Sequence, residues 1–205
     1  RVPVFGADGE GIREAADVVA SGGVVLYPTE TVYGLGGDPH EVVVMERIRR
    51  LKGRDADKPV LVLTDDWARV VAWLDGVSEA HRRLMTHEPP LPVTLLFDAA
   101  SATPPWLVGP DGWVGVRRTS DLFCRAVIGR ADCALLSTSA NEAGGTAPHQ
   151  FDDVPSAIRE GVDCAIDAGQ PLAGTPSTVI RFDGEDLVAI REGAVHVKTL
   201  REIIG

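Results

Sequence analysis

The sequence predicts an α/β fold, with an open, twisted, mixed sheet flanked by helices in a single domain over residues 1–205. Two observations carry this prediction. Short runs of β-favouring apolar residues alternate with segments of helical periodicity, and several short strands follow one another late in the chain. A chain of 205 residues can also bury one substantial core, and it contains no internal repeat and no long linker.

The predicted elements run from a first covering helix, which two glycines end, to a helix at the end of the chain. In the first half they are a helix over 11–21, a strand over 24–27, a helix that begins with Asp38, Pro39 and Glu41 and ends near 51, a strand over 60–63 opened by Pro59, a helix from a cap at Asp65 or Asp66 to 74, and a helix over 78–86. In the second half they are strands over 93–97 and 113–117, a helix from Thr119 or Ser120 to about 128, a strand over 134–136, a short helix over 156–160, strands over 163–167 and 187–191, and a helix over 198–204.

The charge balance is acidic, because 20 Lys and Arg against 30 Asp and Glu give a net charge of −10. Such a field repels a phosphate backbone, so any RNA contact has to be local. The segment 47–58, with six basic and two acidic residues, is either a solvated helix face or such a contact. No apolar run approaches the ~20 residues of a membrane span and no secretory signal is visible, so we expect a cytoplasmic protein without membrane association.

The cysteines and histidines do not have the spacing of metal ligands. The three cysteines lack a CxxC pair, which argues against a zinc site or a disulfide framework and favours buried thiols in a reducing compartment. The five histidines show no metal spacing either, and we expect His81 and His87 on or just after an exposed helix face. The sequence therefore predicts no protein-bound metal.

The stretch over residues 23–37, GVVLYPTETVYGLGG, organises the chain. A buried strand ends where Pro28 removes a ladder donor, which places Thr29, Glu30 and Thr31 at its carboxyl end, where ligands bind in α/β proteins. The glycines that follow either adopt positive φ or allow another group to approach the backbone closely. They match neither a P-loop nor a GxGxxG motif, and on their own they also fit an ordinary connection from strand to helix.

Cationic and hydroxyl side chains gather at the ends of predicted elements. Gly53, for example, separates Lys52 from Arg54 and lets both converge on one anion. Arginine offers anions a bidentate fork and lysine a point charge, and neutral donors complete such a site. The candidates are Lys52, Arg54, Arg117 and Arg191 as cations and Thr29, Thr94, Ser137, Ser139, Asn141 and Ser177 as neutral donors.

These motifs resemble those of the YrdC-type L-threonylcarbamoyl-AMP synthases over nearly the whole chain. Residues 23–37 resemble the family's nucleotide-pocket motif, and Lys52 with Arg54 matches its Lys-x-Arg motif. Arg117 ends a strand as in the Val-Arg motif, and residues 139–141 are similar to the Ser-Ala-Asn signature. The chain departs from the family at four positions, which are Pro89 and Leu91 for Trp and Gly in a proline-rich motif, Leu63 for a histidine found in some relatives, and Glu192 for Pro in Arg-Pro-Gly.

The resemblance implies a YrdC-like fold with a concave pocket in which L-threonine, bicarbonate and ATP become threonylcarbamoyl-AMP and pyrophosphate. It implies that Lys52, Arg54, Thr94, Ser139, Asn141 and Arg191 bind ATP, whereas Thr29, Arg117, Ser137 and Ser177 bind threonine. Lys52 and Arg54 would stabilise charge, and Mg²⁺ would arrive with ATP. No acid or base is assigned, because Glu30 is at least as well read as a turn residue that binds backbone amides. The product would pass to a tRNA threonylcarbamoyl-transferase complex.

Two other functions remain open at this stage. The related fold has been associated with double-stranded RNA, so the chain could be an RNA-binding or tRNA-binding module that uses segment 47–58, although its net charge argues against this. It could also be a paralogue that adenylates a different carbamoyl acceptor, since four positions depart from the family pattern.

Overall fold

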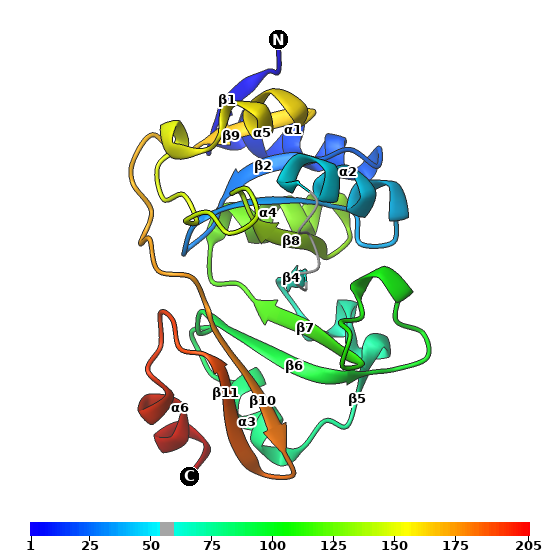
Figure 1. Cartoon of the computed structure of the whole chain (residues 1–205), viewed down its shortest axis with the longest axis vertical. Coiled ribbons are helices and arrows are strands. Elements are labelled where there is room, and N and C mark those ends of the chain that lie inside the picture. Colours follow the sequence, from blue (N-terminus) through cyan, green and yellow to red (C-terminus); the bar gives the residue numbers. More distant parts are fainter. Residues whose placement is uncertain (54–59) are drawn as a thin grey trace.

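The computed structural model describes residues 1–53 and 60–205, and its described strands form one mixed sheet with helices on both faces (Figure 1). The strands lie in the order β1-β9-β2-β3-β8-β4-β7-β6-β10-β11, and β5 pairs with β6 beside this path. They span β1 Val4–Gly6, β2 Val25–Pro28, β3 Tyr33–Gly37, β4 Leu61–Thr64, β5 Leu74–Asp75, β6 Val93–Ala99, β7 Trp113–Arg118, β8 Leu135–Ser139, β9 Cys164–Asp167, β10 Thr178–Asp183 and β11 Asp186–Arg191. The predicted fold class is confirmed.

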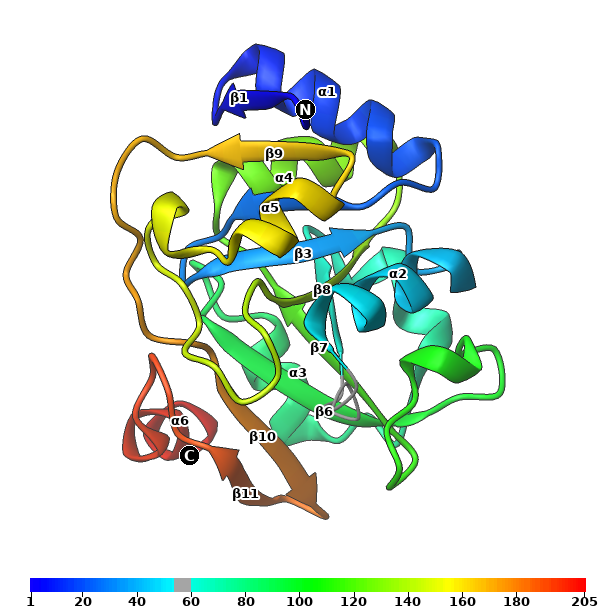
Figure 2. The same ribbon diagram turned by 45° about the horizontal axis from the view of Figure 1, so that its top comes forward.

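The helices pack in pairs against this sheet (Figure 2). They are α1 Gly9–Ala20, α2 Val42–Lys52, α3 Glu79–Met85, α4 Leu122–Ala131, α5 Ser156–Gly161 and α6 Val197–Ile204, with short 3-10 turns η1 Trp67–Arg69, η2 Val71–Trp73, η3 Pro105–Leu107 and η4 Phe151–Asp153. Helices α1 and α4 pack together on one face, α2 packs with α5, and α3 packs with α6 near the β10–β11 end.

The sheet is buried on both faces at its β9–β2–β3 end, which explains the continuous apolar run of β2. Leu26 faces the larger core cluster with Leu35 and Val44, whereas Val25 and Tyr27 face a second cluster formed with α1 and α4. Successive side chains of a strand point to opposite faces, so a strand covered on both sides needs no polar residue.

Strand pairing brings polar residues that are far apart in the sequence onto neighbouring strands. The antiparallel β3–β8 ladder places Gly36 opposite Ser137, and β4 pairs with β8 on its other side. The parallel β4–β7 ladder aligns Leu63 with Arg117, and the parallel β6–β10 ladder aligns Thr94 with Val179. This register assembles a polar surface across the middle of the sheet.

The glycines of residues 34–37 lie in strand β3. They were expected either to adopt positive φ or to allow close approach of another group, and only the second expectation is right. None of them has positive φ. Close approach does require them, because a Cβ on Gly36 would lie 2.1 Å from the Leu136 carbonyl oxygen and one on Gly37 would lie 2.5 Å from the Gly23 carbonyl oxygen. The groups that approach the backbone are the protein's own strands.

Three predicted helices need correction. The side chain of Asp38 accepts from the backbone of His40, and this local turn delays α2 until Val42. Asp66 does cap Ala68, but two 3-10 turns replace the predicted helix because Leu74 pairs with β6. In α4 the cap is Asp121, which accepts from the backbone of Cys124.

The sequence-based prediction also missed elements and misplaced a histidine. Strands β1 and β10 were not predicted: β1 pairs with the distant β9, and β10 lies between the distant β6 and the adjacent β11. His81 is 4% exposed and stacks on Phe97, so its expected place on an exposed face is wrong. The three cysteines are free thiols, and Cys124 and Cys164 are buried. In residues 1–53 and 60–205, no helix is long and apolar enough to cross a bilayer.

Candidate functional site

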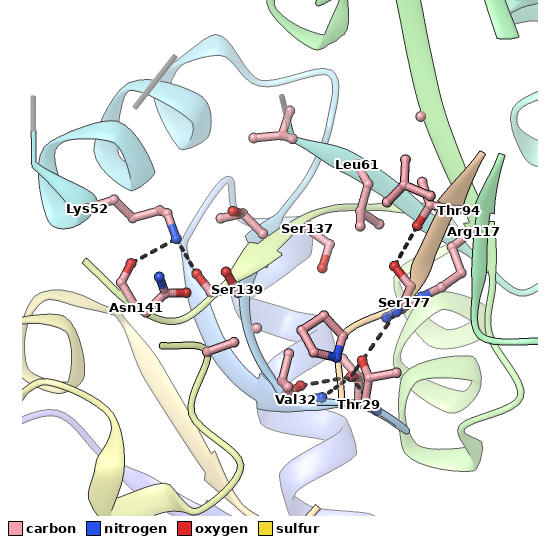
Figure 3. A pocket seen from close by; sticks show the side chains of 18 of the residues that line it. Thr29, Val32, Lys52, Leu61, Thr94, Arg117, Ser137, Ser139, Asn141 and Ser177 are labelled. Carbon is pink, nitrogen blue, oxygen red and sulfur yellow. Dashed lines mark hydrogen bonds between the residues drawn. The ribbon is translucent and has the colours of Figure 1, made fainter. Parts of the chain in front are cut away.

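A cavity of about 440 Å³ lies across the middle of the sheet, between α2 and the β10–β11 hairpin (Figure 3). Strands β3, β4, β6, β7 and β8 contribute to its lining, together with the loops over 29–32, 141–147 and 176–177. Nine of the ten predicted site residues line it, namely Thr29, Lys52, Thr94, Arg117, Ser137, Ser139, Asn141, Ser177 and Arg191. Arg54 lies outside the described residues.

At one end of the cavity, a side-chain network holds Arg117 in place. Arg117 on β7 is only 4% exposed, and its Nη1 donates to the Thr31 hydroxyl at 3.2 Å. Its Nε lies 3.6 Å from Glu30 Oε1, and neither of these two atoms has a hydrogen-bond partner among the described residues. The guanidinium is therefore fixed in orientation while it retains donor capacity.

Glu30 is a support for Arg117, which differs from both earlier interpretations of this residue. Its Oε2 accepts from the Thr119 hydroxyl at 2.9 Å, and its Oε1 faces Arg117. It binds no backbone amide, among the contacts of the described residues. A carboxylate beside a buried arginine compensates part of its charge and limits its rotation.

The turn between β2 and β3 separates the roles of two threonines. The Thr29 hydroxyl accepts from the backbone N–H groups of Thr31 and Val32 and donates to the Val32 carbonyl at 2.8 Å. Its hydrogen-bonding capacity is thus used within the turn. Thr31, which the sequence reasoning did not select, lines the cavity and contacts Arg117.

Strands β6 and β11 and the loop before β10 supply a second group of polar side chains at the Arg117 end. The hydroxyls of Thr94 and Ser177 lie 2.9 Å apart, and Arg191 donates through Nη2 to the Ser177 carbonyl at 2.8 Å. The turn after β11 packs closely against the loop that carries Ser177, since a Cβ on Gly193 would lie 2.3 Å from the Pro176 carbonyl oxygen. Gly193 therefore keeps Arg191 close to Ser177.

The two arginines of this end repel each other. Partial burial, and then the positive charge of Arg117, lower the pKa of Arg191. Both guanidiniums line the same cavity. An anion placed between them would relieve this repulsion, so the cavity favours negatively charged ligands.

The opposite end of the cavity is organised around Lys52, the last residue of α2. Its Nζ donates to the backbone carbonyls of Ser139 and Asn141, the latter at 2.8 Å (Figure 3). The Asn141 amide in turn donates to the carbonyls of Glu142 and Gly145, at 2.8 Å each. These contacts order the loop after β8.

Asn141 also presents an acceptor that has no partner. Asn141 is only 9% exposed, and its buried Oδ1 makes no hydrogen bond with any described residue. A buried carbonyl oxygen without a donor costs free energy, about 1–3 kcal/mol. A ligand that carries an N–H or O–H group would satisfy it.

Sequence reasoning missed several further lining residues. Arg49 lies three positions before Lys52, on the same side of α2, and its spacing from Lys52 was the available signal. Gly115 opens the floor of the cavity, since a Cβ there would lie 3.1 Å from Leu96 and 3.3 Å from Thr94. Nothing in the sequence pattern distinguishes this glycine from others.

All four positions that depart from the family pattern lie outside the lining formed by the described residues. Leu63 is fully buried in the cluster with α4, and Leu91 packs on the core near Trp67. Glu192 pairs with His196 on the surface at 2.7 Å. Pro89 lies outside the lining as well, whereas Thr94, which follows the proline-rich motif, lines the cavity.

The fold and the cavity define an α/β protein with a built site for an anionic ligand, and comparisons identify its family. The family model Sua5/yciO/yrdC, described as telomere recombination, matches residues 17–193. The threonylcarbamoyl-AMP synthase of Thiobacillus denitrificans is 41% identical over 125 residues, which make up 61% of this chain and 66% of that protein. The chain belongs to the Sua5/YciO/YrdC family.

Solved structures of relatives superpose over the whole chain. Pyrococcus abyssi Sua5, in a crystal structure complexed with L-threonine, gives a TM-score of 0.90 at 27% identity and covers 100% of this chain and 61% of its own. Escherichia coli YciO gives a TM-score of 0.84 at 25% identity and covers 98% of both chains. The chain thus spans about two thirds of the T. denitrificans protein, less of P. abyssi Sua5, and nearly all of YciO.

Proposed function

We propose that this protein makes L-threonylcarbamoyl-AMP and pyrophosphate from L-threonine, bicarbonate and ATP, for threonylcarbamoyladenosine modification of tRNA. The observation that carries the proposal is the convergence of Lys52, Arg117 and Arg191 with hydroxyl and amide groups in one cavity. A volume of about 440 Å³ suits small-molecule ligands. The name of the T. denitrificans relative and the threonine complex of P. abyssi Sua5 support the same reading.

The two ends of the cavity suit two different ligands. In our proposal ATP extends from the Lys52 end, where the Asn141 Oδ1 without a described partner accepts from the nucleotide, toward Thr94 and Arg191. Threonine occupies the Arg117 end, where the fixed guanidinium takes its carboxylate. We assign Lys52, Arg54, Thr94, Ser139, Asn141 and Arg191 to ATP and Thr29, Arg117, Ser137 and Ser177 to threonine.

We refine two of these assignments. Because the Thr29 hydroxyl is used within its turn, Thr29 would act by shaping that turn, and we add Thr31 as the hydroxyl that contacts Arg117. Thr94 and Ser177, assigned to different ligands, lie 2.9 Å apart. We infer that this pair marks the place where the carbamate and the α-phosphate meet.

Catalysis would follow from positioning and charge neutralisation. The amine of threonine either attacks CO₂ and releases a proton or attacks bicarbonate with loss of water, and both routes give a carbamate. The carbamate oxygen then bonds to the α-phosphorus while the bond from phosphorus to pyrophosphate breaks. Holding such partners together supplies on the order of 7–11 kcal/mol. The described lining residues include no carboxylate and no histidine, which fits a site whose side chains orient and neutralise rather than transfer protons.

Mg²⁺ would arrive bound to ATP. The described lining offers it neutral hydroxyl oxygens and no carboxylate, which fits an ion held mainly by phosphates that offsets their charge. The unstable product would pass in the cytoplasm to a tRNA threonylcarbamoyl-transferase complex. A tRNA contact through segment 47–58 would be weak, because Arg47 already pairs with Asp163 at 2.5 Å.

The test is pyrophosphate release from MgATP and bicarbonate, with L-threonine, L-serine, glycine or no amino acid. We expect release that depends on L-threonine. Release with another amino acid but not with threonine would replace this function by that of a paralogue with a different acceptor. RNA binding that persists without ATP and has a salt slope of several units, in the absence of any release, would favour a binding module.

A further inference from the structure

A buried tyrosine outside the predicted site contacts one of the cavity hydroxyls. Tyr27 on β2 is 2% exposed, and its hydroxyl donates to Ser137 Oγ on β8 at 2.7 Å. Strands β2 and β8 are not neighbours, because β3 lies between them. The side chain therefore crosses a whole strand to reach the cavity lining.

The glycines of β3 make this crossing possible. A Cβ on Gly36 would lie 2.9 Å from the Tyr27 hydroxyl oxygen and 3.0 Å from its Cε1, and one on Gly34 would lie 3.4 Å from its Cζ. Both distances at Gly36 are shorter than, or at the limit of, normal van der Waals contact. Residues 34–36 thus form a slot for the tyrosine ring, which gives these glycines a purpose other than binding phosphate.

The environment of Tyr27 defines which group donates. Burial raises the pKa of the Tyr27 phenol well above its ordinary value, so the hydroxyl keeps its proton. Its ring packs in the apolar cluster with Phe123 and Cys124, away from solvent. A hydroxyl group has one donor and two acceptor sites, so a Ser137 oxygen that accepts from Tyr27 keeps its own proton for another partner.

Ser137 is 3% exposed and lines the cavity between Ser139 and Arg117 (Figure 3). Among the described residues, only Tyr27 donates a hydrogen bond to its Oγ. We propose that Tyr27 is a positioning residue that makes Ser137 a hydrogen-bond donor toward the carboxylate or carbamate oxygens of the amino-acid substrate. This inference rests on the proposed function and specifies how its amino-acid end recognises an anion.

A positioning role for Tyr27 has different measurable effects from a purely structural role of a buried hydroxyl. A purely structural contact would affect folding stability alone, whereas a positioning role affects the threonine end of the reaction and leaves the ATP end intact. It also predicts that Tyr27 acts only through Ser137, so the effects of losing either hydroxyl cannot add.

The experiment compares wild type with Tyr27→Phe, Ser137→Ala and the double variant. We expect Tyr27→Phe to raise the KM and the calorimetric Kd for L-threonine about tenfold and to leave the KM for ATP within about twofold. The double variant should match Ser137→Ala. Thr103→Val is the matched control, because it removes a buried hydroxyl that donates to the Trp73 carbonyl outside the cavity lining, and it should leave both KM values unchanged.

Three results would overturn the inference. They are an unchanged threonine Kd in Tyr27→Phe, an equal rise of both KM values, and effects of Tyr27→Phe and Ser137→Ala that multiply. A wild type that binds L-threonine but releases no pyrophosphate would contradict only the proposed function, and the Kd comparison would still decide the role of Tyr27. A wild type that binds no L-threonine would overturn both.

Discussion

The two ends of the cavity are built in different ways. At the Arg117 end, side chains from separate strands and turns bind one another, as in the contacts of Arg117 with Thr31 and Glu30 and of Thr94 with Ser177. At the Lys52 end, side chains bind backbone carbonyls of one loop, as Lys52 does at Ser139 and Asn141.

This difference indicates which end changes when ligands bind. Arg117 is buried on β7 and held by Thr31 and Glu30 of the β2–β3 turn, so its position is set before any ligand arrives. The Lys52 ammonium donates to loop carbonyls, and a phosphate would have to compete with them for its protons. We therefore expect a preformed amino-acid end and a nucleotide end that rearranges with ATP.

The strongest test of the preformed end is Arg117→Ala. We expect threonine-dependent pyrophosphate release to fall at least 100-fold, because the carboxylate loses its bidentate partner. We also expect the free energy of unfolding to fall by about 3 kcal/mol, because Glu30 keeps a largely buried charge without its cation. A pyrophosphate assay measures the loss of activity, and urea unfolding measures the loss of stability.

The double variant Arg117→Ala/Glu30→Gln separates these two effects. It removes the uncompensated charge, so stability should recover while activity stays lost. Recovery of activity together with stability would show that Arg117 only stabilises the fold. It would contradict the binding of the amino-acid carboxylate by Arg117.

Lys52→Ala tests the nucleotide end and should have a smaller effect. We expect kcat/KM for ATP to fall about 30-fold, as for loss of a hydrogen bond to a charged group, with a stability loss below about 1 kcal/mol. The control is Lys198→Ala, which removes the same side chain from an exposed position on α6. A stability loss as large as that of Arg117→Ala would erase the contrast between the two ends.

Two threonine variants sharpen the amino-acid end further. Thr29→Val leaves two backbone N–H groups of the turn without an acceptor, so it should lower stability by about 2 kcal/mol. Thr31→Val removes the hydroxyl that contacts Arg117 and the Thr29 hydroxyl but leaves the backbone hydrogen bonds of the turn intact. It should therefore raise the threonine KM severalfold and lower stability less than Thr29→Val does. The reverse pattern in kinetics and urea unfolding would return the binding role to Thr29.

The candidate site could be predicted from sequence to the extent that its chemistry lies at the ends of elements. Cations and hydroxyls at such positions converge in this fold, and nine of the ten selected residues line one cavity. The choice between Thr29 and Thr31 could not be made, because only the hydrogen bonds of the turn distinguish two hydroxyls two residues apart. Tyr27 was read as an apolar strand residue, since nothing in the sequence places Ser137 across from it.

The fold was predictable where local pattern determines structure and not where distant pairing does. The amphipathic α1 and the apolar β2 were recognised from their own residues. Strand β1 pairs with the distant β9, and β10 pairs with the distant β6 as well as with β11 in a hairpin, and no local pattern reports the two parallel ladders. The same applies to residues 67–75, where pairing of Leu74 with Ala99 prevents a continuous helix.

The smallest expected effect is on the free energy of unfolding at acidic pH, and it depends on His81, which contacts strand β6 next to the amino-acid end. His81 on α3 lies 3.2 Å through Nε2 from the carbonyl of Leu96, a residue of β6 that lines the cavity, and its Nδ1 accepts from the Ser78 backbone N–H. Burial lowers the pKa of His81, against smaller opposing effects of the Leu96 contact, Glu185 and Asp98.

The lowered pKa means that the His81 imidazole takes up a proton less readily in the folded chain than in the unfolded chain. Once the pH falls below about 6.5, the unfolded chain therefore binds more protons and the free energy of unfolding decreases. One such group changes the free energy of unfolding by at most about 1.4 kcal/mol per pH unit. We expect urea unfolding between pH 7.5 and 5 to show a steeper loss in wild type than in His81→Gln, which cannot titrate there. Parallel curves would mean that His81 takes up its proton equally in both states, and that acid leaves the β6 support of the Arg117 end intact.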